Sequence, residues 1–203
     1  MFGENGLYPI LTLLLASLVI MGSPGPSTIS ATAMGAAYGF RRSLGYVSGL
    51  IVGTVAVLLA VAAGVVAVLL SVPHGALVLT VVSAVYILYL AFRIATAPPL
   101  ARSNDQVAAP AFSGGFLLAV ANPKAYVAIA AVFAGVSVFQ DRRLLDTTVK
   151  IALLTGMIVA IHIVWLLVGA SLSRFLQHPT VSRAVNISLA VLLVVATAFA
   201  VVG

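Results

Sequence analysis

The sequence consists mainly of apolar runs about as long as a lipid bilayer is thick, and this pattern limits the possible folds severely. A membrane-crossing helix needs about 20 predominantly apolar residues. Only 7% of the 203 residues are charged, whereas a soluble domain carries about 25%. We therefore expect an all-α polytopic membrane protein with six transmembrane helices. Their expected ranges are 7–39, 44–71, 76–97, 112–139, 147–172 and 181–202.

Charge and residue types exclude several classes of function. The net charge is +6, but the basic residues stand singly or in pairs at the ends of apolar runs, which is typical of membrane orientation and not of nucleic-acid binding. The chain has no Cys, so disulfides, thiolate metal ligands and thiol nucleophiles are excluded. Its three His and four acidic residues are scattered, with no acid inside an apolar run. We predict no enzyme, metal site, cofactor or nucleic-acid partner.

Two of the apolar runs contain a helix-breaking motif near their middle. Ser23-Pro24-Gly25-Pro26 interrupts 7–39, and Asn122-Pro123-Lys124 interrupts 112–139. Proline removes a backbone donor, and glycine permits unusual torsions. A straight helix over 7–39 would be about 50 Å long, well beyond the ~30 Å hydrocarbon core. We expect each run to form two half-helices, with the irregular backbone buried or facing a cavity.

The breaks divide the chain into two halves with the same plan. The matching markers are Pro24 with Pro123, 99 positions apart, Gly35 with Gly135, 100 apart, and Arg41 with Arg142, 101 apart. Three spans per half make the second half enter the membrane from the opposite side, as in inverted-repeat transporters. We predict one transmembrane domain over 1–203, with repeat 1 at about 7–97, a linker at 98–111 and repeat 2 at about 112–202. The alternative is that apolar stretches resemble one another by composition alone.

The basic residues favour one orientation in the membrane. One side carries Arg41, Arg42, Arg93, Arg102, Arg174 and Arg183, and the other carries Arg142, Arg143 and Lys150. Because cytoplasmic loops are enriched in Lys and Arg, the first side is expected inside and both termini outside.

Glycines at four-residue spacing predict close helix contacts. Gly45, Gly49 and Gly53 share one face of the second run, and Gly35 with Gly39 form another pair. Small residues let helix backbones approach closely in lipid. Packing inside one chain and a subunit interface both remain open.

The breaks also predict an anion site. Asn122 is a favoured N-cap and Pro123 suits a first helical position, so a half-helix is expected to begin there. In the first break the start is at Ser23 or Gly25, and Ser27 and Thr28 add hydroxyl groups. Both starts offer free N–H groups and the positive end of a helix dipole, and inverted symmetry would place them face to face. The expected substrate-binding residues are Ser23, Pro24, Gly25, Pro26, Ser27, Thr28, Asn122, Pro123, Lys124 and Tyr86.

The positive charge of Lys124 indicates that this site binds an anion. A charge in mid-membrane costs about 2.5–3.5 kcal/mol or more, and the alternative role is snorkelling to the interface. Because Lys124 lies about 18 Å from either end of its run, its stem is too short for that. Two helix N-termini and an ammonium favour a carboxylate.

Three other polar residues lie in apolar runs. His162 can relay a coupling proton, or it can be a neutral histidine bonded to a neighbouring helix. Asn186 is expected to link helices, with substrate contact as the alternative. Tyr86 is the aromatic residue expected to reach the cavity.

These motifs resemble the LysE (lysine exporter) family, most closely its RhtB branch. The residues that carry the resemblance are Ser23-Pro24-Gly25-Pro26, Gly35-x3-Gly39-x-Arg41, Gly45-x3-Gly49-x3-Gly53, Tyr86-x-Leu88-Tyr89-Leu90-x2-Arg93, Phe112-x2-Gly115-Phe116 and Asn122-Pro123-Lys124. The resemblance implies a homodimeric, proton-driven exporter of amino acids or related small carboxylate metabolites in the bacterial inner membrane.

The fifth run departs from that family. Many members resemble one another in an aspartate at its middle, where this chain has Ala160-Ile161-His162-Ile163. This puts proton coupling and the handling of cationic amino acids in doubt, so neutral amino acids are favoured. The alternatives are export of cationic amino acids or another small solute, and a membrane assembly subunit without transport activity.

Overall fold

The computed structural model describes residues 4–64, 75–96, 110–172 and 179–202, and these ranges contain helices and no strand. The helices are α1 (Glu4–Gly22), α2 (Pro26–Ala62), α4 (Gly75–Ala95), α5 (Phe112–Ala121), α6 (Pro123–Gly135), α7 (Arg143–Leu172) and α8 (Pro179–Val202). The predicted all-α class is therefore confirmed for the described ranges.

The helices have the apolar character of membrane spans. Among the described residues, α2 and α7 are long and apolar enough to cross a membrane, and α5 with α6 make a third candidate if the bent pair is one span. These helices agree with an integral membrane protein. The count of six spans and the inverted repeat stay predictions.

Both predicted breaks are present. α1 ends at Gly22 and α2 begins at Pro26, with Gly25 in the N-cap position. α5 ends at Ala121 and α6 begins at Pro123, and the axes of these two helices differ by 62°. Each half-helix after a break begins with proline, as expected for a residue that lacks the N–H a first turn leaves unused.

A third irregularity lies inside α2, at Gly39. The Oγ of Ser43 donates a hydrogen bond to the carbonyl oxygen of Met34 over 2.8 Å, although nine residues of straight helix would span about 13 Å. Gly39 has φ +74° and ψ 174°, a conformation that a Cβ disfavours. The chain therefore folds back here, and α2 comprises two helical parts, 26–38 and 40–62, close to the predicted boundary between the first two spans.

The second predicted span extends too far. A helix was expected to continue to residue 71, but α2 ends at Ala62 and Gly64 has a φ of +75°. This left-handed residue stops the helix, and a run of Val and Ala on both sides of it gave no sign of the end. The rest of that span lies outside the described residues.

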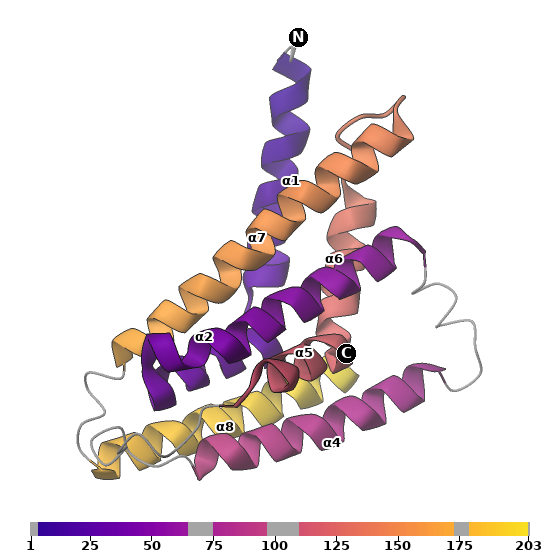
Figure 1. Ribbon diagram of the computed structural model, residues 1–203. Coiled ribbons are helices and arrows are strands. Elements are labelled where there is room, and N and C mark those ends of the chain that lie inside the picture. Colours follow the sequence, from indigo (N-terminus) through magenta and orange to yellow (C-terminus); the bar gives the residue numbers. More distant parts are fainter. Residues whose placement is uncertain (1–3, 65–74, 97–109, 173–178, 203) are drawn as a thin grey trace.

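α2 is the centre of the packing, and Figure 1 shows it between α7 and the pair formed by α4 and α8. Its first part packs against α7, where Gly35 and Gly169 each lie against the opposite backbone. Its second part packs against α5, where a Cβ at Gly49 would fall on the carbonyl oxygen of Phe112. Packing within one chain is thereby confirmed for Gly35 and Gly49, two of the predicted glycines.

Two glycines of the predicted faces have other roles. Gly45 has no atom within 4 Å of where its Cβ would be, and the same holds for Gly39, whose role is the reversal of the chain. Among the described residues, four-residue spacing therefore led to a close contact at Gly49, where α5 lies, whereas a subunit interface stays open for Gly45.

Replacing Gly49 with alanine is expected to destabilise the protein strongly. The new methyl group would meet the backbone of α5 at Phe112, and overpacking typically costs about 1–3 kcal/mol. Each kcal/mol shifts the melting temperature of a chain of this size by about 2–4 °C. Gly45→Ala, one turn away on the same helix, is the matched control and should change the melting temperature in detergent little. Equal melting temperatures for the two variants would contradict this packing.

Candidate functional site

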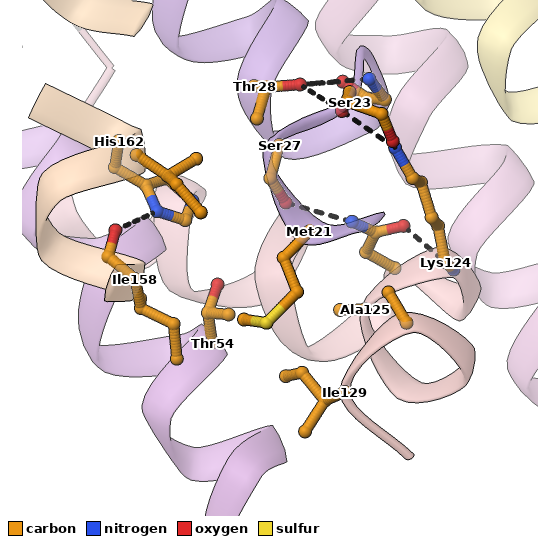
Figure 2. A pocket seen from close by; sticks show the side chains of 14 residues that line it. Met21, Ser23, Ser27, Thr28, Thr54, Lys124, Ala125, Ile129, Ile158 and His162 are labelled. Carbon is orange, nitrogen blue, oxygen red and sulfur yellow. Dashed lines mark hydrogen bonds between the residues drawn. The ribbon is translucent and has the colours of Figure 1, made fainter. Parts of the chain in front are cut away.

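The two breaks meet in space, and two side chains of the second break bond to the first (Figure 2). The Nδ2 of Asn122 donates to the Oγ of Ser27 over 2.9 Å. The Nζ of Lys124 donates to the carbonyl oxygens of Ser23 and Pro24 over 2.7 and 2.8 Å. The irregular segments therefore form one structure, although about 100 residues of chain separate them.

Lys124 has all three of its donors engaged. Its third bond goes to the Oγ of Ser23 over 2.7 Å, and that hydroxyl in turn donates to the carbonyl oxygen of Ile20. The carbonyl groups at the end of α1 carry the negative end of the helix dipole, and a cation there is favourable. The ammonium thus compensates polar backbone that lipid could not solvate.

Gly25 makes room for this lysine. A Cβ on Gly25 would lie 2.7 Å from Cδ and 2.9 Å from Nζ of Lys124, closer than these atoms can approach. The glycine in the Pro-Gly-Pro sequence therefore lets the lysine stem pass along the backbone of the first break. Its role here is space, because its φ of −171° is ordinary extended backbone.

The remaining polar groups around the breaks are tied to the protein as well. The Oδ1 of Asn122 accepts the backbone N–H of Lys124 over 3.1 Å and caps α6. The backbone N–H of Gly25 donates to the Oγ1 of Thr28 over 2.9 Å at the start of α2. On α7, the Nε1 of Trp165 donates to the carbonyl oxygen of Gly22 over 3.1 Å, so a third helix secures the end of α1.

A small cavity lies against the joined breaks. Its volume is about 40 Å³, which holds roughly three water molecules. The walls come from α1, α2, α6 and α7 and from both breaks. They comprise Met21, Ser23, Gly25, Ser27, Thr28, Thr54, Asn122, Lys124, Ala125, Ala128, Ile129, Ile158, Ile161 and His162.

His162 closes the cavity on the side away from Lys124, as Figure 2 shows. The residue is 4% exposed, and Nδ1 lies 2.8 Å from the carbonyl oxygen of Ile158, one turn earlier on α7. Among the described residues no group bonds to Nε2, which is buried.

Among the described residues, the only formal charge of fixed sign on the cavity lining is the positive charge of Lys124. Lys124 and His162 are the titratable residues of the lining, and no acidic residue is part of it. Asp146 accepts from Lys150 over 3.0 Å and from the backbone N–H groups of Val138 and Phe139, so it fastens the start of α7. Within the described ranges no group of three potential metal ligands exists.

Comparison with known proteins identifies the family. The sequence model of the family described as LysE type translocator matches residues 18–203. The chain belongs to this family. Similar curated proteins are the cysteine/O-acetylserine efflux proteins of Salmonella typhimurium (31% identical), Salmonella paratyphi A (30%) and Escherichia coli K12 (28%), each match covering 88% of this chain and 90% of the relative. No solved structure matches the chain significantly.

As a LysE-type translocator the chain is a transporter and not an enzyme, and the structure shows where its predicted site residues lie. Ser23, Gly25, Ser27, Thr28, Asn122, Lys124 and His162 all line the cavity. Pro24, Pro26 and Pro123 are not part of the lining and set the path of the backbone. The side chain of Tyr86, on α4, lies outside the described part of the structure. Asn186 is buried in α8 away from the lining, as expected of a residue that links helices.

Sequence reasoning missed one polar member of this LysE-type site, Thr54. Its hydroxyl donates to the carbonyl oxygen of Leu50 over 2.8 Å within α2, a bond that any membrane-embedded threonine can make. In the sequence, the feature that could have pointed to Thr54 was a hydroxyl group next to Gly53 in an otherwise apolar stretch. The apolar members, such as Ile129 and Ile158, gave none, because nothing distinguishes them from residues that face lipid.

The bond between Asn122 and Ser27 is expected to stabilise the junction measurably. Asn122→Ala removes an N-cap and this bond, at a cost of about 1–2 kcal/mol, whereas Ser27→Ala removes the bond alone. The double variant should lose less than the sum of the single losses, with a coupling of about 1 kcal/mol in melting experiments. Ser30→Ala is the matched control, because the hydroxyl of Ser30 bonds within its own helix. Additive losses for Asn122 and Ser27 would contradict a direct bond.

Proposed function

We propose that this LysE-type translocator is a secondary active exporter of amino acids, driven by the proton gradient, with neutral amino acids favoured. The names of its relatives support the substrate class: they are efflux proteins for cysteine and O-acetylserine. The observation that carries the proposal is the ammonium of Lys124 at the junction of both helix breaks, on the wall of a cavity.

The carboxylate of the substrate binds at Lys124 in this proposal. Each N–H of the ammonium is now donated to a neutral oxygen of Ser23 or Pro24. A carboxylate is a stronger acceptor than a carbonyl or hydroxyl group, so it can take over one or more of these bonds. The first turns of α2 and α6 begin at the same place and add their positive dipole ends.

Binding then also changes how the helices are held together. The cavity holds roughly three water molecules in this state, so we expect the site to widen when an amino acid occupies it. When a carboxylate replaces Ser23 and Pro24 at Lys124, the segment after α1 loses the hydrogen bonds that join it to α6. Substrate binding therefore weakens the contact between the two breaks.

Neutral substrates fit the lining better than cationic ones. A cationic side chain would need a carboxylate or several strong acceptors in place of its water, and the lining contains no Asp or Glu. It offers the hydroxyl groups of Ser27, Thr28 and Thr54 and apolar side chains. Cysteine and O-acetylserine, the compounds named for the relatives, are neutral overall and are the first substrates to test.

Neutralising Lys124 is expected to remove recognition of the carboxylate. The test compares cysteine with cysteamine, which keeps the ammonium and thiol but lacks the carboxylate. The unaltered protein should prefer cysteine by about tenfold to a hundredfold, the value of a charge-assisted bond. Lys124→Met should bind both compounds alike and lose export of cysteine from proteoliposomes.

Val127→Ala provides the matched control on the same helix. Val127 is an exposed residue of α6, and its replacement should preserve both export and the preference for cysteine. If Lys124→Met still prefers cysteine by the same factor as the unaltered protein, the carboxylate is held elsewhere. If the unaltered protein exports no amino acid in a broad panel, the proposed function itself fails.

The proposal includes a homodimer in the bacterial inner membrane with both termini outside. Because the natural chain has no Cys, single cysteines report the orientation without background. Asp141→Cys should react with a membrane-impermeant maleimide in intact spheroplasts, whereas Arg41→Cys should react only after permeabilisation, since both positions are exposed. The opposite pattern would place the termini inside.

A further inference from the structure

The tautomer of His162 follows from the hydrogen bond that its ring makes within α7. Nδ1 lies 2.8 Å from the carbonyl oxygen of Ile158, and a carbonyl oxygen can only accept. Nδ1 therefore carries the proton of the neutral ring, and Nε2 carries a lone pair. A histidine on a helix interior that bonds back to its own helix in this way presents its other nitrogen to whatever lies beyond the helix.

That lone pair is buried in a place where it needs a donor. His162 is 4% exposed, and none of the described residues bonds to its Nε2. A buried acceptor without a partner costs about 1–3 kcal/mol, and such atoms call for an explanation. His162 is part of the cavity wall, so an occupant can supply the missing donor once the site widens enough to uncover Nε2.

The surrounding groups leave this lone pair as the strongest acceptor for a cation on its side. Of the helices packed against α7, α6 contributes the cation Lys124 to the cavity, and α1 and α2 contribute hydroxyl, backbone and apolar groups. On α7 itself, the ion pair of Asp146 and Lys150 lies between about three and four turns before His162. An ammonium in the cavity would therefore be repelled at Lys124 and accepted at His162.

We propose that Nε2 of His162 holds in turn the ammonium of the substrate and the coupling proton, so that the two exclude each other. This rests on the proposed function and assigns the second end of the same site. An amino acid then lies with its carboxylate at Lys124 and its ammonium at His162, donating one N–H to Nε2. When a proton binds Nε2 from outside, the ring becomes a cation, loses its acceptor and repels the ammonium.

Because the proton and the ammonium exclude each other at His162, the protein can exchange protons for amino acids without an acidic residue in the cavity lining. A proton entering from outside releases the amino acid outside, and loss of that proton to the cytoplasm restores the acceptor for the next amino acid. Each cycle moves one neutral zwitterion out and one proton in, so it carries one positive charge inward. Both the pH difference and the membrane potential then drive export.

The experiment measures binding of cysteine to the purified protein between pH 5.5 and 7.5, together with protons released into a weak buffer. In the pH range where His162 is mostly protonated, the affinity for cysteine should fall about tenfold for each unit by which the pH is lowered. Each cysteine bound there should release close to one proton. A reducing agent can protect the ligand, because the protein has no Cys. The deaminated analogue 3-mercaptopropionate has no ammonium, so its binding should release no proton.

Two variants and a control complete the test. His162→Gln can still accept an ammonium but cannot titrate, so it should bind cysteine with an affinity independent of pH and support counterflow without proton coupling. His162→Leu should bind cysteine no better than 3-mercaptopropionate. Leu167→Ala, an exposed position of α7 outside the cavity lining, should behave as the unaltered protein.

The outcomes separate this inference from the proposed function. Proton release that persists in His162→Gln, or that accompanies 3-mercaptopropionate equally, overturns the shared site at His162. Counterflow of cysteine with pH-independent affinity in the unaltered protein overturns it too, while leaving the amino-acid exporter intact. A protein that binds and exchanges no amino acid fails the proposed function instead.

Discussion

Lipid cannot hydrogen-bond to a polypeptide backbone, and the rest of the structure depends on how the chain solves this at its two helix breaks. The carbonyl groups of Ser23 and Pro24 end a helix where no further turn can satisfy them. Lys124 satisfies them from the other half of the chain, at 2.7 and 2.8 Å. Because an unsatisfied group in lipid costs several kcal/mol, the two irregular segments are stable only in contact with each other.

The same requirement gives the site its chemistry. The ammonium of Lys124 donates to neutral backbone oxygens, and a carboxylate is a stronger acceptor that can replace them. The first turns of α2 and α6 lie beside this ammonium. What stabilises the resting junction is therefore what a substrate carboxylate would replace. A junction made of apolar contacts alone could also hold the helices together, but it would contain no hydrogen-bond donor for a carboxylate.

Local chemistry made some of this predictable from the sequence. Pro24, Pro26 and Pro123 cannot continue a helix, and Asn122 before a proline is an N-cap signal, so both breaks were predicted at the right residues. The reversal at Gly39 and the end of α2 before Gly64 depend on two positive φ angles, which a glycine permits but does not require. Gly45 and Gly49 have the same spacing and different surroundings, because only the position of α5 decides which of them is covered. Thr54 and the apolar residues of the cavity lining could not be predicted either, because the rotation of each helix about its axis decides which of its residues face the cavity.

The two helix breaks contribute different groups to the site. At the second break, Lys124 donates hydrogen bonds to carbonyl groups of the first break. The first break provides the hydroxyl group of Ser27, which accepts from Asn122, and the space beside Gly25 through which the lysine stem passes. The cavity consequently has a cationic end at Lys124 and an end with a neutral acceptor at His162. A molecule with both a carboxylate and an ammonium matches this polarity in one direction only. In the proposed mechanism His162 loses its acceptor when it takes up a proton, whereas Lys124 keeps its charge. The two ends would then differ in function, because Lys124 would select the substrate and His162 would time its release.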